Sequence, residues 1–69
     1  MSTWMVGIDT GGTFTDLIAM EVESRRLRVA KVPSVPHDPS TAVMNALDEL
    51  FRTGVRPEEV SFLAHGTTV

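Results

Sequence analysis

The sequence predicts an α/β domain in which three strands come first, one helix follows and a fourth strand comes last. Apolar and polar residues alternate with the two-residue period of strands between residues 4 and 32. Apolar residues then recur at the three- and four-residue spacing of a helix between residues 43 and 51. Residues 60–64 form a short uncharged apolar run, typical of a strand in a parallel sheet. The expected order is β-β-β-α-β: an antiparallel three-strand meander plus one parallel strand.

Two glycines separate the first two strands. Because Gly11-Gly12 interrupts two alternating segments, the sequence predicts an antiparallel hairpin with its turn at this point. In the second strand of this hairpin, Asp16 shares a face with Phe14 and Ile18. Burial of that face would require a partner for the carboxylate, because an unpaired buried charge is costly.

The helix has clear start and stop signals. Asp38 suits the N-cap and Pro39 the first helical position, whereas Gly54 stands where a C-cap glycine belongs. The expected apolar stripe consists of Val43, Ala46, Leu47, Leu50 and Phe51. The expected segments are strands at 4–10, 14–22, 26–32 and 60–64, turns at 23–25 and 57–59, an extended connection at 33–37 and a loop at 65–69.

Length and composition set further limits. The chain has 69 residues, two histidines and no cysteine, which excludes disulfides, thiol nucleophiles and cysteine-ligated zinc. A domain this short buries only about 60% of its unfolded surface, and the last strand should have neighbours on both sides. The sheet is therefore expected to be incomplete, and residues 1–69 to form the amino-terminal part of one domain in a much longer chain.

Charge and hydropathy exclude some partners. The net charge of −3 argues against a nucleic-acid footprint, and Arg25, Arg26 and Arg28 are expected at a solvated strand edge. No apolar run approaches the roughly 20 residues of a membrane span, and the first residues lack the pattern of a signal peptide. The expected compartment is the cytoplasm.

The segment that carries chemistry is Gly-Ile-Asp-Thr-Gly-Gly-Thr-Phe-Thr-Asp, residues 7–16. Glycines at a turn allow close approach of the backbone to a ligand, and successive amides can form an anion-binding nest. Asp9 beside such a nest is explained by a bound Mg²⁺, because the carboxylate alone would repel a phosphate. The alternative is a tight hairpin turn in which Asp9 and Asp16 are solvated or cap the turn.

A second candidate segment, His65-Gly66-Thr67-Thr68, follows the last strand. Ligands of open α/β sheets bind beyond the carboxyl ends of parallel strands, so Gly66 and the threonines could line the same cleft as the first segment. His65 suits acid–base chemistry by its pKa, but a histidine at a strand end is more often a structural hydrogen-bonding residue.

Together these two segments resemble the amino-terminal domain of the hydantoinase A, 5-oxoprolinase and acetone carboxylase β-subunit family. That family belongs to the actin-like ATPase superfamily, which has a ribonuclease-H-like fold. The first segment is similar to the phosphate-1 hairpin of the superfamily, and the resemblance covers all 69 residues. Members are much longer, and this sequence has no counterpart of their second phosphate motif or adenosine motif.

The resemblance implies ATP-dependent hydrolysis of a cyclic amide such as hydantoin, 5-oxoproline or another lactam, through phosphorylation of the amide oxygen. The related alternative is a ketone carboxylase of the acetone type. ATP and Mg²⁺ are the implied ligands, and a B-type subunit is the implied partner in a hetero-oligomer.

The resemblance also implies a role for each residue of the two motifs. The amides of Gly11, Gly12 and Thr13 would hold the β- and γ-phosphates. Asp9 would organise Mg²⁺ or the attacking group. The hydroxyls of Thr10, Thr13 and Thr15 would assist, Asp16 would act from further out or through water, and Gly66, Thr67 and Thr68 would border the cleft.

Two readings from other classes remain open at this point. Asp9-Thr10-Gly11 also matches the catalytic turn of aspartic proteases, in which two copies of the aspartate share a proton. The second reading is a non-catalytic module that packs on a partner through its incomplete sheet.

Overall fold

The computed structural model describes residues 2–67, apart from the side chains of residues 62, 65 and 67. Its four-stranded sheet has the order β3-β2-β1-β4. β1 pairs antiparallel with β2 and parallel with β4, and β2 pairs antiparallel with β3. The predicted α/β class and β-β-β-α-β order are confirmed. The elements are β1 (Trp4–Thr10), β2 (Phe14–Glu21), β3 (Leu27–Pro33), α1 (Pro39–Arg52), the 3-10 turn η1 (Pro57–Glu59) and β4 (Val60–Thr67).

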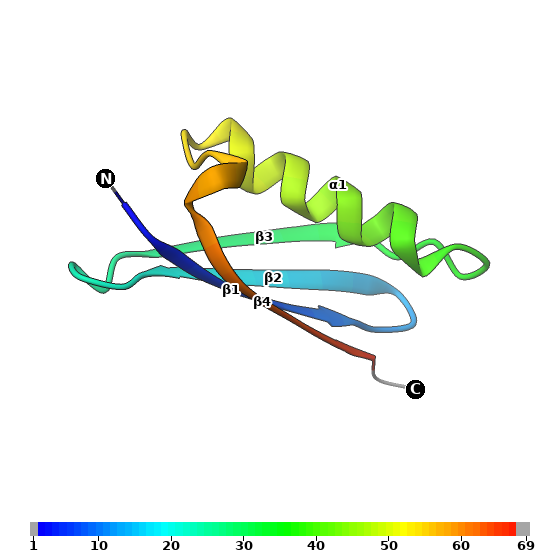
Figure 1. Cartoon of the computed structure of the whole chain (residues 1–69). Coiled ribbons are helices and arrows are strands. Elements are labelled where there is room, and N and C mark those ends of the chain that lie inside the picture. Colours follow the sequence, from blue (N-terminus) through cyan, green and yellow to red (C-terminus); the bar gives the residue numbers. More distant parts are fainter. Residues whose placement is uncertain (1, 68–69) are drawn as a thin grey trace.

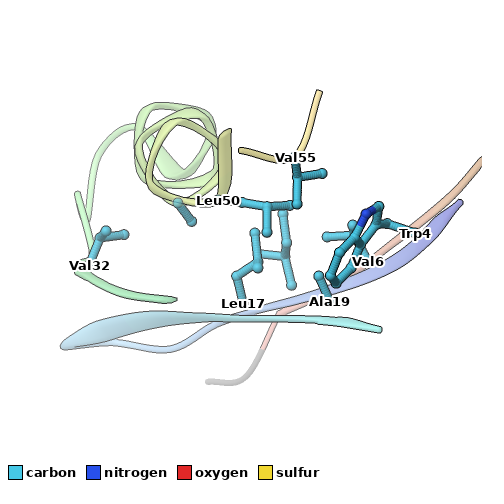
Figure 2. Packing of buried hydrophobic residues seen from close by; sticks show 9 residues of the cluster. Trp4, Val6, Leu17, Ala19, Val32, Leu50 and Val55 are labelled. Carbon is cyan, nitrogen blue, oxygen red and sulfur yellow. The ribbon is translucent and has the colours of Figure 1, made fainter. Parts of the chain in front are cut away.

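α1 lies across one face of the sheet, and the core fills the space between them (Figure 1). Figure 2 shows Leu50 of the helix and Val55 directed toward Leu17 and Val6 of the strands. Both strands contribute every second residue to this core, which is the alternation that predicted them. The buried hydrophobic residues are Trp4, Val6, Ile8, Leu17, Ala19, Val32, Ala42, Ala46, Leu50 and Val55.

The helix follows its sequence signals closely. Asp38 is the N-cap, and its carboxylate accepts hydrogen bonds from the hydroxyls of Thr41 and Ser40 at 2.6 and 2.7 Å. These bonds, that of Thr41 first, lower the pKa of Asp38. Gly54 follows the helix with a φ of +105°, the conformation that favours glycine. None of the helices described within residues 2–67 is long and apolar enough to cross a membrane.

The turn between β2 and β3 is built without glycine. Arg25 has a φ of +62°, the only non-glycine residue with positive φ among residues 2–67. The carboxylate of Glu21, only 5% exposed, accepts the N–H groups of Ser24, Glu23 and Thr3 at 2.9, 3.2 and 3.4 Å. The side chain of Glu21 thus orders a turn whose sequence contains no specialised turn residue.

The two faces of the sheet differ in exposure. The face of Phe14, Asp16 and Ile18 is the exposed one, because α1 packs on the opposite face. We call this exposed side the open face: Met5, Phe14, Ile18, Leu27 and Val29 on it are between 42% and 74% exposed. β3 is an edge strand of the described sheet, and Arg25 and Arg26 near its start are exposed, as expected. The guanidinium groups of Arg26 and Arg28 also lie 5.9 and 5.7 Å from the ring centre of Trp4.

The last strand differs from its prediction in length and burial. The sequence predicts a loop from residue 65, but β4 continues to Thr67 because its ladder with β1 runs on through the pairs Ile8–His65, Asp9–Gly66 and Thr10–Thr67. β4 is also an edge strand within residues 2–67, with Leu63 49% exposed. Its apolar composition therefore predicts the pairing correctly, whereas the expected burial is absent in the described part of the sheet.

Candidate functional site

One row of residues crosses all four strands on the open face. Asp9 of β1 pairs with Asp16 of β2 on one side and with Gly66 of β4 on the other, and Asp16 pairs with Lys31 of β3. We call Gly66, Asp9, Asp16 and Lys31 the acidic row. The sheet therefore brings together the two segments singled out in the sequence, although 57 positions separate Asp9 from Gly66.

Gly66 of the second segment lies next to Asp9 of the first. A methyl group placed on Gly66 would lie 4.0 Å from Oδ1 of Asp9, so this glycine borders the carboxylate directly. Thr67 continues the strand opposite Thr10, and Thr68 lies outside the described residues. The cleft-lining role predicted for this segment thus has a structural basis at Gly66 and stays a prediction for the two threonines.

The acidic row lines part of an open pocket with a volume of about 790 Å³. Its apolar floor comes from the middle of the open face, and its polar end from the carboxylates and Lys31. This division is typical of small-molecule sites, in which apolar walls surround a few polar groups. The lining residues are Gly7, Ile8, Asp9, Asp16, Leu17, Ile18, Val29, Ala30, Lys31, Ala64 and Gly66.

The acidic row contains two carboxylates and one ammonium group. Asp9 and Asp16 are directly opposite on antiparallel strands, an arrangement in which like charges repel. Lys31 is next in the row, and its ammonium nitrogen lies 4.8 Å from the ring centre of Phe14. Within residues 2–67, no three His, Cys, Asp or Glu side chains come together. A Mg²⁺ ion held here would therefore take its remaining ligands from water and phosphate, which suits its preference.

The turn of the β1–β2 hairpin lies beside the acidic row. The N–H of Gly11 donates to the carbonyl of Phe14 at 3.0 Å, so this amide closes the turn. A side chain on Gly11 would meet that carbonyl oxygen at 3.0 Å, which explains glycine there. Gly12 and Thr13 form the exposed tip. The three amides predicted to hold phosphate are thus not equivalent, because that of Gly11 has a partner in the turn.

The three threonines of the first segment lie in two different places, two on the helix side of the sheet and one at the turn. Thr10 and Thr15 are 6% and 0% exposed and lie on the helix side of the sheet, opposite to the acidic row. The Thr15 hydroxyl lies 2.9 Å from that of Ser34. Only Thr13 is exposed at the turn. The contact of these hydroxyls with phosphate stays a prediction, for which Thr13 is best placed.

Sequence reasoning missed two residues of this region, Lys31 and Ser34. The alternation of the third strand carried the signal for Lys31, because residues of one parity share a face with Asp16 once the meander is paired. Ser34 stands just after Pro33 in a segment predicted as a plain connection, so nothing in the sequence marked it. Its hydroxyl donates to the carbonyl of Gly11 at 2.7 Å, and its N–H donates to that of Thr13 at 2.9 Å.

Comparisons with known proteins identify the family of the chain. A family model for the hydantoinase/oxoprolinase N-terminal region matches residues 5–69. The chain is 36% identical over 66 residues to an uncharacterized protein of Methanocaldococcus jannaschii, and 37% identical over 71 residues to caprolactamase subunit alpha of Pseudomonas jessenii. Each alignment covers 96% of this chain but only 9% and 10% of the respective relative.

The chain is an α/β domain in which the antiparallel β1–β2 hairpin places Asp9 opposite Asp16, next to the parallel pair of β1 and β4. The chain belongs to the hydantoinase/oxoprolinase N-terminal family, as the family match over residues 5–69 shows. It spans about a tenth of the length of the curated relatives it matches.

Proposed function

We propose that this chain is the amino-terminal part of a ribonuclease-H-like, actin-like ATPase domain in a longer enzyme that hydrolyses cyclic amides with ATP. The observation that carries the proposal is the acidic row beside the glycine turn, at the carboxyl ends of β1 and β4. Family membership and the name of the caprolactamase relative support a cyclic amide as the substrate class.

The phosphates of ATP would lie against the tip of the β1–β2 turn. The exposed amides of Gly12 and Thr13, with the Thr13 hydroxyl, would donate to phosphate oxygens, as anion nests do. Asp9 would hold Mg²⁺ directly or through water, and Asp16 would orient its water ligands. Lys31 would offset charge at the other end of the row. Mg²⁺ would neutralise the transferring phosphoryl group, and positioning by these residues would supply most of the remaining catalysis.

Phosphorylation of the amide oxygen would turn a poor electrophile into a good one. The amide nitrogen donates electrons into its carbonyl, which makes an unstrained cyclic amide resistant to water. Transfer of the γ-phosphoryl group from ATP to that oxygen would release ADP and make the carbonyl carbon more electrophilic. Water would add to this carbon, and the C–N bond would break as the ring nitrogen leaves as a protonated amine. The resulting acyl phosphate would react with a second water to give the carboxylate and inorganic phosphate. Asp9 would act in the first of these steps, because it lies beside the phosphates.

The test is turnover by the intact polypeptide that contains this sequence. We expect Mg-ATP-dependent opening of caprolactam, hydantoin or 5-oxoproline, followed as ADP release and ring-opened product. Asp9→Asn should lower kcat by about 100-fold or more, since it removes the carboxylate proposed to hold Mg²⁺ at the reacting phosphates. Asp48→Asn, an exposed position on α1, is the matched control and should leave the rate unchanged.

Two results would contradict the proposal. Ring opening at the same rate without ATP would exclude phosphorylation, and an unchanged rate in Asp9→Asn would exclude the role of this residue. Consumption of acetone and bicarbonate in place of the cyclic amides would identify the carboxylase branch.

We also propose that the enzyme works with a B-type subunit. The printed name of the Pseudomonas relative, a subunit alpha, supports a multi-subunit enzyme. Co-expression with the B-type subunit should give a complex of defined mass and raise the rate of amide hydrolysis above that of the longer chain alone.

A further inference from the structure

Ser34 lies directly beneath the glycine turn and contacts it at three points. Its hydroxyl donates to the Gly11 carbonyl at 2.7 Å, and its N–H donates to the Thr13 carbonyl at 2.9 Å. The Thr15 hydroxyl lies 2.9 Å from the Ser34 hydroxyl. Ser34 follows β3, so these bonds attach the turn to a segment more than 20 residues further along the chain.

The direction of each hydroxyl bond follows from the chemistry of the acceptor. A carbonyl oxygen only accepts, so the single hydroxyl proton of Ser34 points at Gly11. The Ser34 oxygen must then accept the proton of Thr15, which is wholly buried. The hydroxyls therefore form a directed chain from Thr15 through Ser34 to the Gly11 carbonyl.

This chain fixes the orientation of the peptide between Gly11 and Gly12. The peptide is trans and planar, so its N–H points opposite to its carbonyl. With the Gly11 carbonyl held toward Ser34, the Gly12 N–H is directed away from Ser34. A glycine pair is otherwise free to rotate this peptide, because neither residue restricts its backbone through a side chain.

We propose that Ser34 is a positioning residue that presents the Gly12 amide to the substrate phosphate, with Thr15 as its support. The proposal rests on the function proposed above and assigns Thr15 a role through Ser34. Ser34 does not touch phosphate itself. Ser34 holds the Gly11–Gly12 peptide in one orientation before phosphate binds. Binding then does not have to bear the entropy cost of stopping the rotation of this peptide.

The experiment compares Ser34→Ala with Ser34→Thr in the intact enzyme, by steady-state kinetics with Mg-ATP varied. Ser34→Ala should raise KM for ATP by about tenfold, the effect of one well-placed hydrogen bond, with kcat lowered less. Ser34→Thr keeps the hydroxyl and should restore KM to within about threefold of the wild type. Thr15→Val, which removes the donor to Ser34, should fall between the two.

The matched control is Thr53→Ala at the end of α1. The Thr53 hydroxyl donates to the carbonyl of Leu50 at 2.7 Å, the same kind of bond at the same length, but far from the turn. Ser34→Ala and Thr53→Ala should lower the melting temperature by similar amounts, and only Ser34→Ala should change KM.

Two outcomes would overturn the positioning role. If Ser34→Ala lowers stability as Thr53→Ala does but leaves KM unchanged, Ser34 is only structural, and the proposed function stands as long as Asp9→Asn is inactive. If the wild-type enzyme neither binds nor uses Mg-ATP, the proposed function fails and the phosphate role of Ser34 fails with it. Wild-type kinetics are measured first, so these two failures are told apart.

Discussion

At the scale of single residues, Glu21 is a buried carboxylate held by main-chain donors. The N–H of Ser24, its hydroxyl and the N–H of Glu23 favour the charged form and lower the pKa of Glu21 from 4.5 to about 2. A group whose pKa is lower in the folded state stabilises the fold above its unfolded pKa. The contribution of Glu21 is therefore fully present above pH 4.5 and is lost as the pH falls toward 2.

The corresponding prediction concerns Glu21→Gln. This variant should be less stable than the wild type at pH 6, and the difference should shrink as the pH falls from about 4.5 toward 2. Urea unfolding of the chain at several pH values measures it. Glu49→Gln, an exposed position on α1, is the control, and a difference that stays constant with pH would contradict the assignment.

The left-handed backbone of Arg25 gives a second residue-scale prediction. Left-handed conformations cost an L-residue roughly 1–2 kcal/mol, and glycine adopts them freely at the cost of more unfolded-state entropy. Arg25→Gly should therefore raise the free energy of unfolding by about 0.5 kcal/mol, whereas Arg25→Ala keeps the strain and should not. Denaturant unfolding measures the free energy of unfolding of both variants. Equal changes in the two would argue against strain at Arg25.

At the scale of elements, the sequence patterns predicted the presence and type of each helix and strand better than which face of a strand is buried. The stripe of α1 is confirmed: Ala46 and Leu50 are buried, and Val43, Leu47 and Phe51 pack against the core. The alternation of β2 separated Phe14 and Ile18 from Thr15, Leu17 and Ala19 but did not show that α1 packs on the second set. Alternation predicts two faces, and only the position of the helix decides which one is buried.

In the candidate site, some residues could be predicted from local motifs, whereas others depend on how distant strands pair. The glycine turn, the two aspartates and Gly66 could be found from local motifs. Ser34 could not, because its role depends on the register between β2 and β3, which places the residue after Pro33 beside Thr13. The extension of β4 to Thr67 was also missed, since threonine and glycine near a strand end equally suggest a loop.

The core contact of α1 gives the element-scale prediction. Leu50 is 2% exposed and packs against both strands of the hairpin region, so Leu50→Ala should cost about 2–5 kcal/mol. Met44, on the opposite side of the helix, is 55% exposed, and Met44→Ala should cost less than about 0.5 kcal/mol. Chemical denaturation of the two variants provides the comparison, and similar losses would place the core elsewhere.

At the scale of the whole molecule, the open face is the dominant feature. One side of the sheet has α1 and the core, while the other exposes neighbouring apolar side chains, among them the paired residues Ile18 and Val29. Contiguous exposed apolar surface favours association in water. The chain on its own is therefore expected to self-associate through this face.

The prediction uses Ile18→Thr combined with Val29→Thr. Threonine keeps the β-branched shape that suits a strand, so the fold should persist while the apolar area falls. Sedimentation velocity over a range of concentrations should show less association than for the wild-type chain. Met44→Thr, which removes an exposed apolar residue outside the open face, should change nothing, and a wild-type chain that stays monomeric throughout would refute the expectation.

The central place of β1 has a consequence for the order in which the molecule is made. β1 pairs with β2 through a turn of three residues, but it pairs with β4 only after the chain has returned over more than 50 residues. Local pairings form early because their loop-closure entropy is small, and distant ones form late. On a ribosome, the glycine turn would therefore exist well before Gly66 has been synthesised. Arrival of β4 would complete the acidic row, so that this row would form later than the glycine turn beside it.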